Sequence, residues 1–170
     1  MANRKTNRIL HDYGDGTILI DISTPKYPNA TSKMDAVDFE RSTGRICLGR
    51  GEYPQIIHHG KTVVVHRIIF PDWKSTDHIN RNRADNRRCN LRQCTRSQNA
   101  INCSARSNNT SGAIGVTWNK ANTNWRARIK INRTQISLGC FVIKEDAIAV
   151  RRQAEKHYFG EFAPIRQATA

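Results

Sequence analysis

The segment from residue 71 to residue 110 limits most strongly how this chain can fold. It holds few apolar side chains and many Asn, Asp and Arg residues. A stretch of this composition buries too little apolar surface to offset the entropy lost when its backbone is ordered. We therefore expect it to be organised around something else, such as a metal ion or DNA.

The charge of the chain points to a polyanionic partner. The formal charge is +14 over 170 residues, and most of the excess lies after residue 65. Between residues 81 and 96 a series of arginines is opposed only by Asp85. A surface made soluble by charge usually mixes both signs, so we favour a nucleic-acid partner, with DNA or RNA as the default.

Several classes of protein are excluded by composition. The longest apolar runs fall far short of the roughly 20 residues of a membrane span. The first eight residues are basic without the apolar core of a secretory signal. The five cysteines are scattered and form no Cys-x-x-Cys pair, which predicts reduced thiols and no structural zinc. We therefore expect a cytoplasmic protein.

The apolar patterning on either side of this segment predicts an α+β protein. Before it, we expect strands at 17–22, 45–48, 55–58 and 62–70, a loop at 23–33, and a hairpin turn at His59-Gly60-Lys61. After it, the capping-box pattern Thr95-x-x-Gln98 predicts a short helix to about residue 105. A polar linker, strands at 113–118, 125–131 and 134–138, and a helix at 144–159 follow. That helix has an apolar stripe of Ile143, Ala147, Val150, Ala154 and Tyr158.

The polar segment contains a series of residues suited to metal-dependent hydrolysis. Asp77 and Asn99 can offer two hard oxygen ligands to one divalent cation if the intervening loop folds back. His78 would then stand beside the ion, able to take a proton from an attacking water. In order, the series reads Val65-His66-Arg67, Asp77-His78-Ile79-Asn80, Asp85-Asn86-Arg87-Arg88-Cys89-Asn90-Leu91-Arg92 and Ser97-Gln98-Asn99.

This series resembles the HNH nucleases, in particular their phage-type, homing-endonuclease branch. The resemblance implies a ββα-metal fold preceded by N-terminal β-strands, one bound divalent ion, and a phage protein acting in the bacterial host cell. It also implies that His78 is the general base, that Asp77 and Asn99 are metal ligands, and that Asn90 braces the loop. Arg67 either neutralises the scissile phosphate or forms an ordinary salt bridge. His66 fits a core or hinge position, with a catalytic role as the alternative.

One position departs from the family pattern. Many HNH members have His at the last position of the motif, where this chain has Asn99. An amide oxygen suits Mg²⁺, with Mn²⁺ as the alternative, better than it suits zinc or nickel. The departure also permits an inactive copy, so a non-cutting, sequence-specific DNA-binding regulator with a degenerate HNH motif is the alternative function.

The strand expected at 125–131 predicts a DNA-facing sheet. Trp125, Ala127, Ile129 and Ile131 alternate there with three cations, so the apolar set faces one way and Arg126, Arg128 and Lys130 face the other. The helix at 144–159 covers the apolar face and leaves the cations open, which suits a sheet lying in a DNA major groove.

This C-terminal part resembles the plant ethylene-response-factor (Apetala-type) DNA-binding domain. The resemblance rests on Gly115-Val116-x-Trp118, Trp125-Arg126-Ala127-Arg128-Ile129, Leu138-Gly139-x-Phe141 and Tyr158-Phe159-Gly160. It implies DNA contacts from Thr117, Asn119, Arg126, Arg128 and Lys130, beside Arg81, Arg87 and Arg88 of the first half. Trp118 and Trp125 fit either the core or a DNA contact.

Together these features predict two domains and one function. We expect an HNH endonuclease domain at 1–106 with its core at about 62–106, a linker at 107–111, and an Apetala-type DNA-binding domain at 112–165. The whole would be a metal-dependent endonuclease that nicks double-stranded DNA as a monomer or weak dimer. We expect no membrane partner and no small-molecule substrate, and a basic RNA-binding protein is a further alternative.

Overall fold

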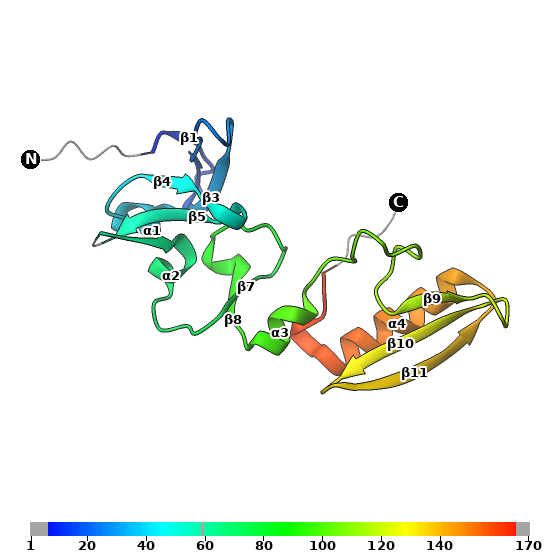
Figure 1. Ribbon diagram of the computed structural model, residues 1–170. Helices are drawn as coiled ribbons and strands as arrows, with labels where there is room; N and C mark the ends of the chain where they lie inside the picture. Colours follow the sequence, from blue (N-terminus) through cyan, green and yellow to red (C-terminus); the bar gives the residue numbers. More distant parts are fainter. Residues whose placement is uncertain (1–6, 59, 166–170) are drawn as a thin grey trace, which may run out of the picture. The chain divides into compact units, whose positions relative to one another are not determined.

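The computed structural model describes residues 7–58 and 60–165, which belong to two compact units. The division falls between Arg96 and Ser97, N-terminal to the linker expected at 107–111. Both units combine small antiparallel sheets with a few helices (Figure 1). The expected α+β class is therefore confirmed.

The first unit contains two three-stranded sheets and a two-stranded ribbon. The strands of the first sheet are β1 (Ile9–Asp12), β2 (Thr17–Asp21) and β3 (Thr31–Asp35), in that order. The second sheet has β4 (Ile46–Leu48), β5 (Pro54–His58) and β6 (Lys61–Val64), and the ribbon pairs β7 (Thr76–His78) with β8 (Leu91–Gln93). Two short α-helices, α1 (Ala36–Arg41) and α2 (Val65–Ile69), and 3₁₀ turns at Arg50–Glu52 and Arg88–Asn90 complete the unit.

One apolar core joins these elements. In β2 and β3, Ile18 lies opposite Met34, and in β4 and β5, Ile46 lies opposite Ile56. The buried cluster also takes in Leu91 at the start of β8. The polar segment is thus anchored in a core that it does not build itself. The cluster consists of Ile18, Ile20, Ile22, Met34, Ile46, Ile56, Val65, Ile69 and Leu91.

The strand expected at 62–70 is wrong in its second half. The strand ends at Val64, and residues 65–69 form α2. The β-branched run favours a strand by propensity. In a helix, however, Val65 and Ile69 stand four positions apart on one face, and both are buried in the core. Packing therefore outweighs propensity here.

Other sequence expectations for this unit have mixed outcomes. β2, β4 and β5 agree with the expected strands, whereas the loop expected at 23–33 gives way to β3 at Thr31. The hairpin turn at His59-Gly60-Lys61 includes His59, which lies outside the described residues. On either side of it, His58 of β5 pairs with Lys61 of β6.

The second unit is a three-stranded antiparallel sheet packed on one long helix. The strands β9 (Val116–Asn119), β10 (Asn124–Ile131) and β11 (Thr134–Phe141) lie in the order β11-β10-β9. Helix α4 (Lys144–Phe159) has the expected bounds, and its Ala147 is fully buried with Val116 and Ala127 of the sheet. The helix expected from Thr95 to about residue 105 is the shorter α3 (Arg96–Ile101). A 3₁₀ turn at Gly160–Phe162 follows α4.

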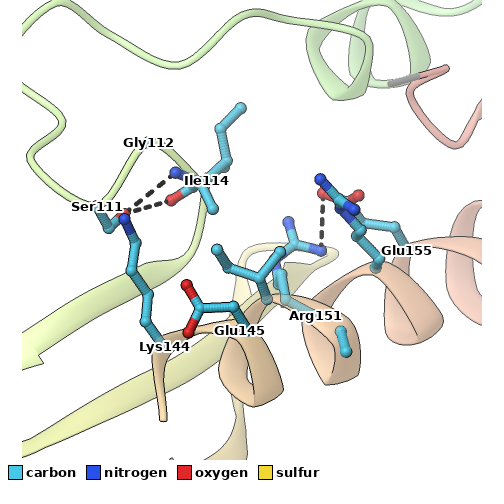
Figure 2. A pocket seen from close by; sticks show the side chains of 11 residues that line it. Ser111, Gly112, Ile114, Lys144, Glu145, Arg151 and Glu155 are labelled. Carbon is cyan, nitrogen blue, oxygen red and sulfur yellow. Dashed lines mark hydrogen bonds and ion pairs between the residues drawn. The ribbon is translucent and has the colours of Figure 1, made fainter. Parts of the chain in front are cut away.

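The apolar stripe expected on α4 is only partly correct. Ala147 and Ala154 are buried, but Ile143 and Tyr158 at the two ends are exposed. The buried face instead includes Arg151 and Glu155, whose side chains form an ion pair at 3.1 Å (Figure 2). The absence of a side chain at Gly115 leaves room for the buried Arg151, because a Cβ atom at Gly115 would lie 2.5 Å from Arg151 Nε.

The helices of the described residues are too short or too polar to cross a membrane.

Candidate active site

Asp77 and His78 end strand β7, and both side chains are buried. Asp77 is 3% exposed and His78 is 5% exposed, although consecutive strand residues point to opposite faces. Both faces of β7 are therefore covered at its C-terminal end. Across the ribbon, Asp77 lies opposite Arg92 and His78 lies opposite Leu91. The acid–histidine pair thus lies in the interior, where the chain enters the loop at 79–90.

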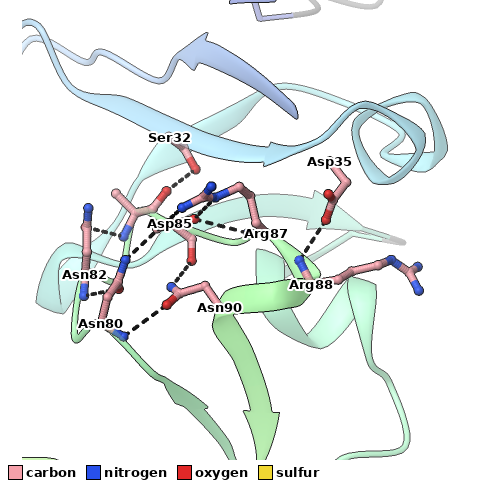
Figure 3. A network of polar contacts seen from close by, with 9 residues as sticks. Ser32, Asp35, Asn80, Asn82, Asp85, Arg87, Arg88 and Asn90 are labelled. Atoms are coloured by element: carbon pink, nitrogen blue, oxygen red, sulfur yellow. Dashed lines mark hydrogen bonds and ion pairs between the residues drawn. The ribbon is translucent and has the colours of Figure 1, made fainter. Parts of the chain in front are cut away.

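Asn90 ties the two ends of this loop together. Its side-chain amide donates to the carbonyl of Asp85 at 2.8 Å and accepts from the backbone N–H of Asn80 at 3.0 Å (Figure 3). Its own carbonyl accepts from the backbone N–H of Ile79 at 2.9 Å. These contacts hold the residues that directly follow His78 in one conformation.

Asp85 is the polar centre of the loop. Its carboxylate accepts from Arg87 at 2.8 and 2.7 Å and from the Asn80 amide at 2.8 Å. Burial by itself would raise the pKa of Asp85, but the hydrogen bonds and charge of Arg87 outweigh it and lower that pKa. Asp85 therefore stays ionised and organises the loop around it.

Strand β3 of the N-terminal sheet is hydrogen-bonded to the loop at 79–90. Lys33 of β3 donates its backbone N–H to the carbonyl of Ala84 at 2.9 Å and accepts from the backbone N–H of Asn86 at 2.8 Å. Ser32 Oγ donates to the same carbonyl of Ala84 at 2.7 Å. Nothing in the sequence pattern of β3 identifies it as a support for the loop, since the contacts span about 50 positions.

The arginines predicted to contact DNA in this unit have different environments. Arg88 donates from its side chain to both oxygens of Asp38 at 2.7 Å. Its backbone N–H donates to the carboxylate of Asp35 (Figure 3). The guanidinium of Arg87 likewise donates to both carboxylate oxygens of Asp85. Arg81 is exposed, and so is Arg67, for which the sequence predicts a contact with the scissile phosphate or a salt bridge. The structure thus gives Arg87 and Arg88 a role in fixing the loop.

Aromatic rings surround His78. The ring of His66 lies edge-to-face against it with centroids 5.4 Å apart, and the ring of Tyr53 lies 6.1 Å from it. The Cζ atom of Arg83 lies 4.7 Å from the centroid of the Tyr53 ring, and Arg83 Nη1 donates to the carbonyl of Gly51 at 2.7 Å. Sequence reasoning missed Tyr53 and Arg83 as neighbours of His78, because no local pattern connects them to the motif.

Burial keeps both histidines neutral. Burial lowers the pKa of His78 below its ordinary value, against the opposing effects of the hydrogen bond to Asn86 Oδ1 and the charge of Asp77. Burial, with the charges of His78 and Arg67, lowers the pKa of His66 to about 4. At neutral pH, His78 is therefore an uncharged imidazole that can accept a proton.

Asp77 has the chemistry of a ligand for a hard cation. Its Oδ2 accepts from Arg92 Nε at 2.8 Å and from Nη2 at 2.6 Å. A carboxylate offers two oxygens with several lone pairs, and Mg²⁺ prefers such oxygens. Among residues 7–58 and 60–165, no three His, Cys, Asp or Glu side chains are grouped so that they could hold a metal ion together.

Asn99, the other expected ligand, is exposed on α3, in the part of that helix that belongs to the second unit. Asp77, His78 and Asn90 all belong to the first unit. An ion shared by Asp77 and Asn99 therefore stays a prediction from the sequence.

The sheet of the second unit has one apolar and one cationic face. Ala127 and Ile129 of β10 are buried, and the alternating Arg126, Arg128 and Lys130 lie on the opposite face. Thr117 of β9 lies opposite Arg126 and accepts a hydrogen bond from Arg128 at 3.4 Å. Asn119 lies opposite Asn124 at the hairpin end.

Strand β11 adds residues to this cationic face that sequence reasoning missed. Gln135 pairs with Lys130, Ser137 with Arg128, and Cys140 with Arg126, and all three are exposed. No acidic residue occurs between Val116 and Phe141. The signal that could have found these residues is the alternation in β11, which a bulge between Ser137 and Gly139 interrupts.

The two tryptophans of the sheet have different exposures. Trp125 is half-buried and packs against the core of the unit, whereas Trp118 is 43% exposed. Their rings contact edge-to-face with centroids 5.2 Å apart. Trp125 therefore belongs with the core, and Trp118 keeps an accessible surface.

Comparison of the chain with protein-family models, with curated proteins and with solved structures yields no match.

Proposed function

We propose that this chain is a metal-dependent DNA endonuclease of the HNH type that nicks double-stranded DNA. The observation that carries the proposal is the neutral, buried His78 beside the buried carboxylate of Asp77, at the root of a loop braced by Asn90. In this proposal, β7, β8 and α3 are the two strands and the helix of the ββα-metal motif.

His78 acts as the general base. Its imidazole is uncharged at neutral pH, so it can take a proton from the water that attacks the scissile phosphorus. The charge of Asp77 favours the protonated ring that results. Asp77 itself accepts two hydrogen bonds from Arg92.

Asp77 would hold the divalent ion from the first unit, and Asn99 is the second ligand that the HNH resemblance implies. When bound, Mg²⁺ supplies electrostatic stabilisation of the charge that develops on the phosphate and on the leaving oxygen. The chain itself supplies the carboxylate, the base and the fixed loop between them.

The second unit holds the DNA in this proposal. An acid-free, cationic sheet face with exposed Thr, Gln and Ser side chains suits both phosphate and base-edge contacts. The arrangement of three strands on one helix supports an Apetala-type reader. One catalytic histidine per chain implies that a monomer cuts one DNA strand. The HNH resemblance further implies a phage protein that acts in the host cytoplasm.

One observation favours the alternative of a non-cutting DNA-binding regulator. Arg92 donates two hydrogen bonds to Asp77 Oδ2, so the arginine competes with a metal ion for this carboxylate. If Arg92 keeps it, the second unit would bind DNA while the first unit does no chemistry.

Incubation of supercoiled plasmid with the full chain separates the two functions. With Mg²⁺ we expect an open-circular product, and with chelator in excess we expect none. A retarded plasmid band without nicking, at any Mg²⁺ or Mn²⁺ concentration, would reject the nuclease in favour of the regulator.

A further inference from the structure

We infer that Asn86 is the positioning residue of the base: it holds His78 through Nε2–H, so that Nδ1 is the atom that receives the proton. This inference rests on the proposed nuclease function, which it deepens by naming the reacting atom and the residue that selects it. Asn86 is 0% exposed, and its Oδ1 lies 3.3 Å from His78 Nε2.

The orientation of the Asn86 amide is set by its other partners. Asn86 Nδ2 donates to the carbonyl of Arg83 at 3.3 Å and to Ser32 Oγ at 3.4 Å. The hydroxyl of Ser32 gives its own hydrogen to the carbonyl of Ala84 at 2.7 Å. Ser32 therefore presents a lone pair, and not a hydrogen, to the amide.

The flipped amide is unfavourable at this position. It would place Asn86 Oδ1 against the carbonyl of Arg83, so that two acceptors would face each other in a buried site. Nδ2 therefore faces Arg83 and Ser32, and Oδ1 faces His78.

The amide orientation then selects the tautomer of the ring. An amide oxygen only accepts hydrogen bonds, so His78 Nε2 must carry a hydrogen. A neutral imidazole has one N–H, which leaves Nδ1 as the basic nitrogen.

The N-terminal sheet takes part in this arrangement. The backbone N–H of Asn86 donates to the carbonyl of Lys33 at 2.8 Å, and Ser32 of the same strand, β3, contacts the Asn86 amide. β3 thus fixes both the backbone and the side chain of Asn86. The first sheet is not part of the HNH motif, but through Asn86 it holds the His78 ring in place.

The test is long-range ¹H–¹⁵N NMR on the full chain with ¹⁵N-labelled histidine, without metal, at a fixed pH of about 7.5. The His78 signals are identified by their loss in His78→Gln. We expect the pattern of an Nε2–H tautomer with an unprotonated Nδ1. An Nδ1–H tautomer in the wild-type chain would overturn the inference, and this readout needs no variant of Asn86 to fold.

Variants of Asn86 and Ser32 then test the cause. Asn86→Leu removes the acceptor and should give a mixture of the two tautomers. Ser32→Ala removes one of the two acceptors that orient the amide and should give a smaller shift. Unchanged His78 signals in both Asn86→Leu and Ser32→Ala would contradict the assignment.

Nicking kinetics connect the tautomer to function. We expect Asn86→Leu to lower kcat by about 10- to 100-fold with KM for plasmid unchanged. Nicking by a chain whose His78 is Nδ1–H would reject this inference and leave the nuclease standing. An Nε2–H ring in a chain that does not nick would reject the nuclease and leave only the hydrogen bond.

Discussion

The rings of His66 and His78 meet edge-to-face with their centroids 5.4 Å apart, and burial keeps both uncharged. Two protonated rings at this distance would repel each other, so neither ring takes up a proton readily. The contact has a direct consequence for stability, because the two histidines bind protons readily only when the chain unfolds.

The stability of the first unit should therefore fall as the pH is lowered from about 6.5. The pKa of His66 is about 4 in the folded chain and has its ordinary value of 6.5 when unfolded. Between these values the unfolded state binds more protons, so the free energy of unfolding rises with pH across this window. Above pH 6.5 the full contribution of the neutral His66 to the free energy of unfolding is present.

Urea unfolding at pH 5 and pH 7.5 measures this dependence. The wild-type chain should unfold at lower urea concentration at pH 5. His66→Phe keeps an aromatic ring without a titrating group, and its difference between the two pH values should be smaller. An equal difference in both chains would show that His66 does not titrate as described.

The proposed metal ligation by Asp77 and Asn99 predicts non-additive variants. Asp77→Ala and Asn99→Ala should each raise the Mg²⁺ concentration needed for nicking, and the double variant should be little worse than either, because groups that act as one unit lose their effect together. The measurement is the nicking rate against Mg²⁺ concentration. Fully multiplicative losses would show that the two residues do not share an ion.

Gly115 should be one of the least replaceable residues of the second unit. Its φ is +77°, and a Cβ atom would lie 2.3 Å from the carbonyl oxygen of Arg128. Gly115→Ala should lower the free energy of unfolding by about 2–4 kcal/mol, from backbone strain together with the clash. The measurement is the thermal unfolding of the full chain, followed by circular dichroism.

Gly112 provides the matched control for Gly115. It has nearly the same φ, +74°, but nothing lies within 4 Å of a Cβ atom there. Gly112→Ala should cost only about 1–2 kcal/mol from the left-handed conformation. Equal losses in the two variants would contradict the close packing of Gly115 on β10.

The cationic face of the second unit should set the salt dependence of DNA binding. Arg126→Ala should reduce the slope of log affinity against log salt concentration by about one, because one phosphate contact is lost. Arg152→Ala removes an exposed cation of α4 and should leave the slope unchanged. Fluorescence anisotropy with labelled duplex at several salt concentrations gives both slopes, and equal slopes would contradict the assignment of this face.

Elements with a strong local pattern could be predicted from the sequence. The bounds of α4 follow from its periodicity, and the faces of β10 follow from its alternation of apolar residues with Arg and Lys. The strand expected through Phe70 failed because the core needs Val65 and Ile69 on one side of a helix. Local propensity carries no information about that tertiary requirement.

The candidate site was predictable only in part, for the same reason. Asp77, His78 and Asn90 stand in one continuous motif with fixed spacing. Ser32 and Asn86, in contrast, are 54 positions apart and meet only when β3 is laid beside the loop. Likewise, no pattern in the sequence of α4 indicates that Arg151 and Glu155 are buried as a pair, since charged residues normally mark the exposed face.

The most direct test of the central claim compares two histidine variants in single-turnover nicking of supercoiled plasmid with Mg²⁺. His78→Ala should lower the rate by about 100-fold or more while plasmid affinity is unchanged, because general-base catalysis contributes about that factor. His11→Ala, an exposed histidine on β1, should cut at the wild-type rate. Wild-type nicking by His78→Ala would contradict the account.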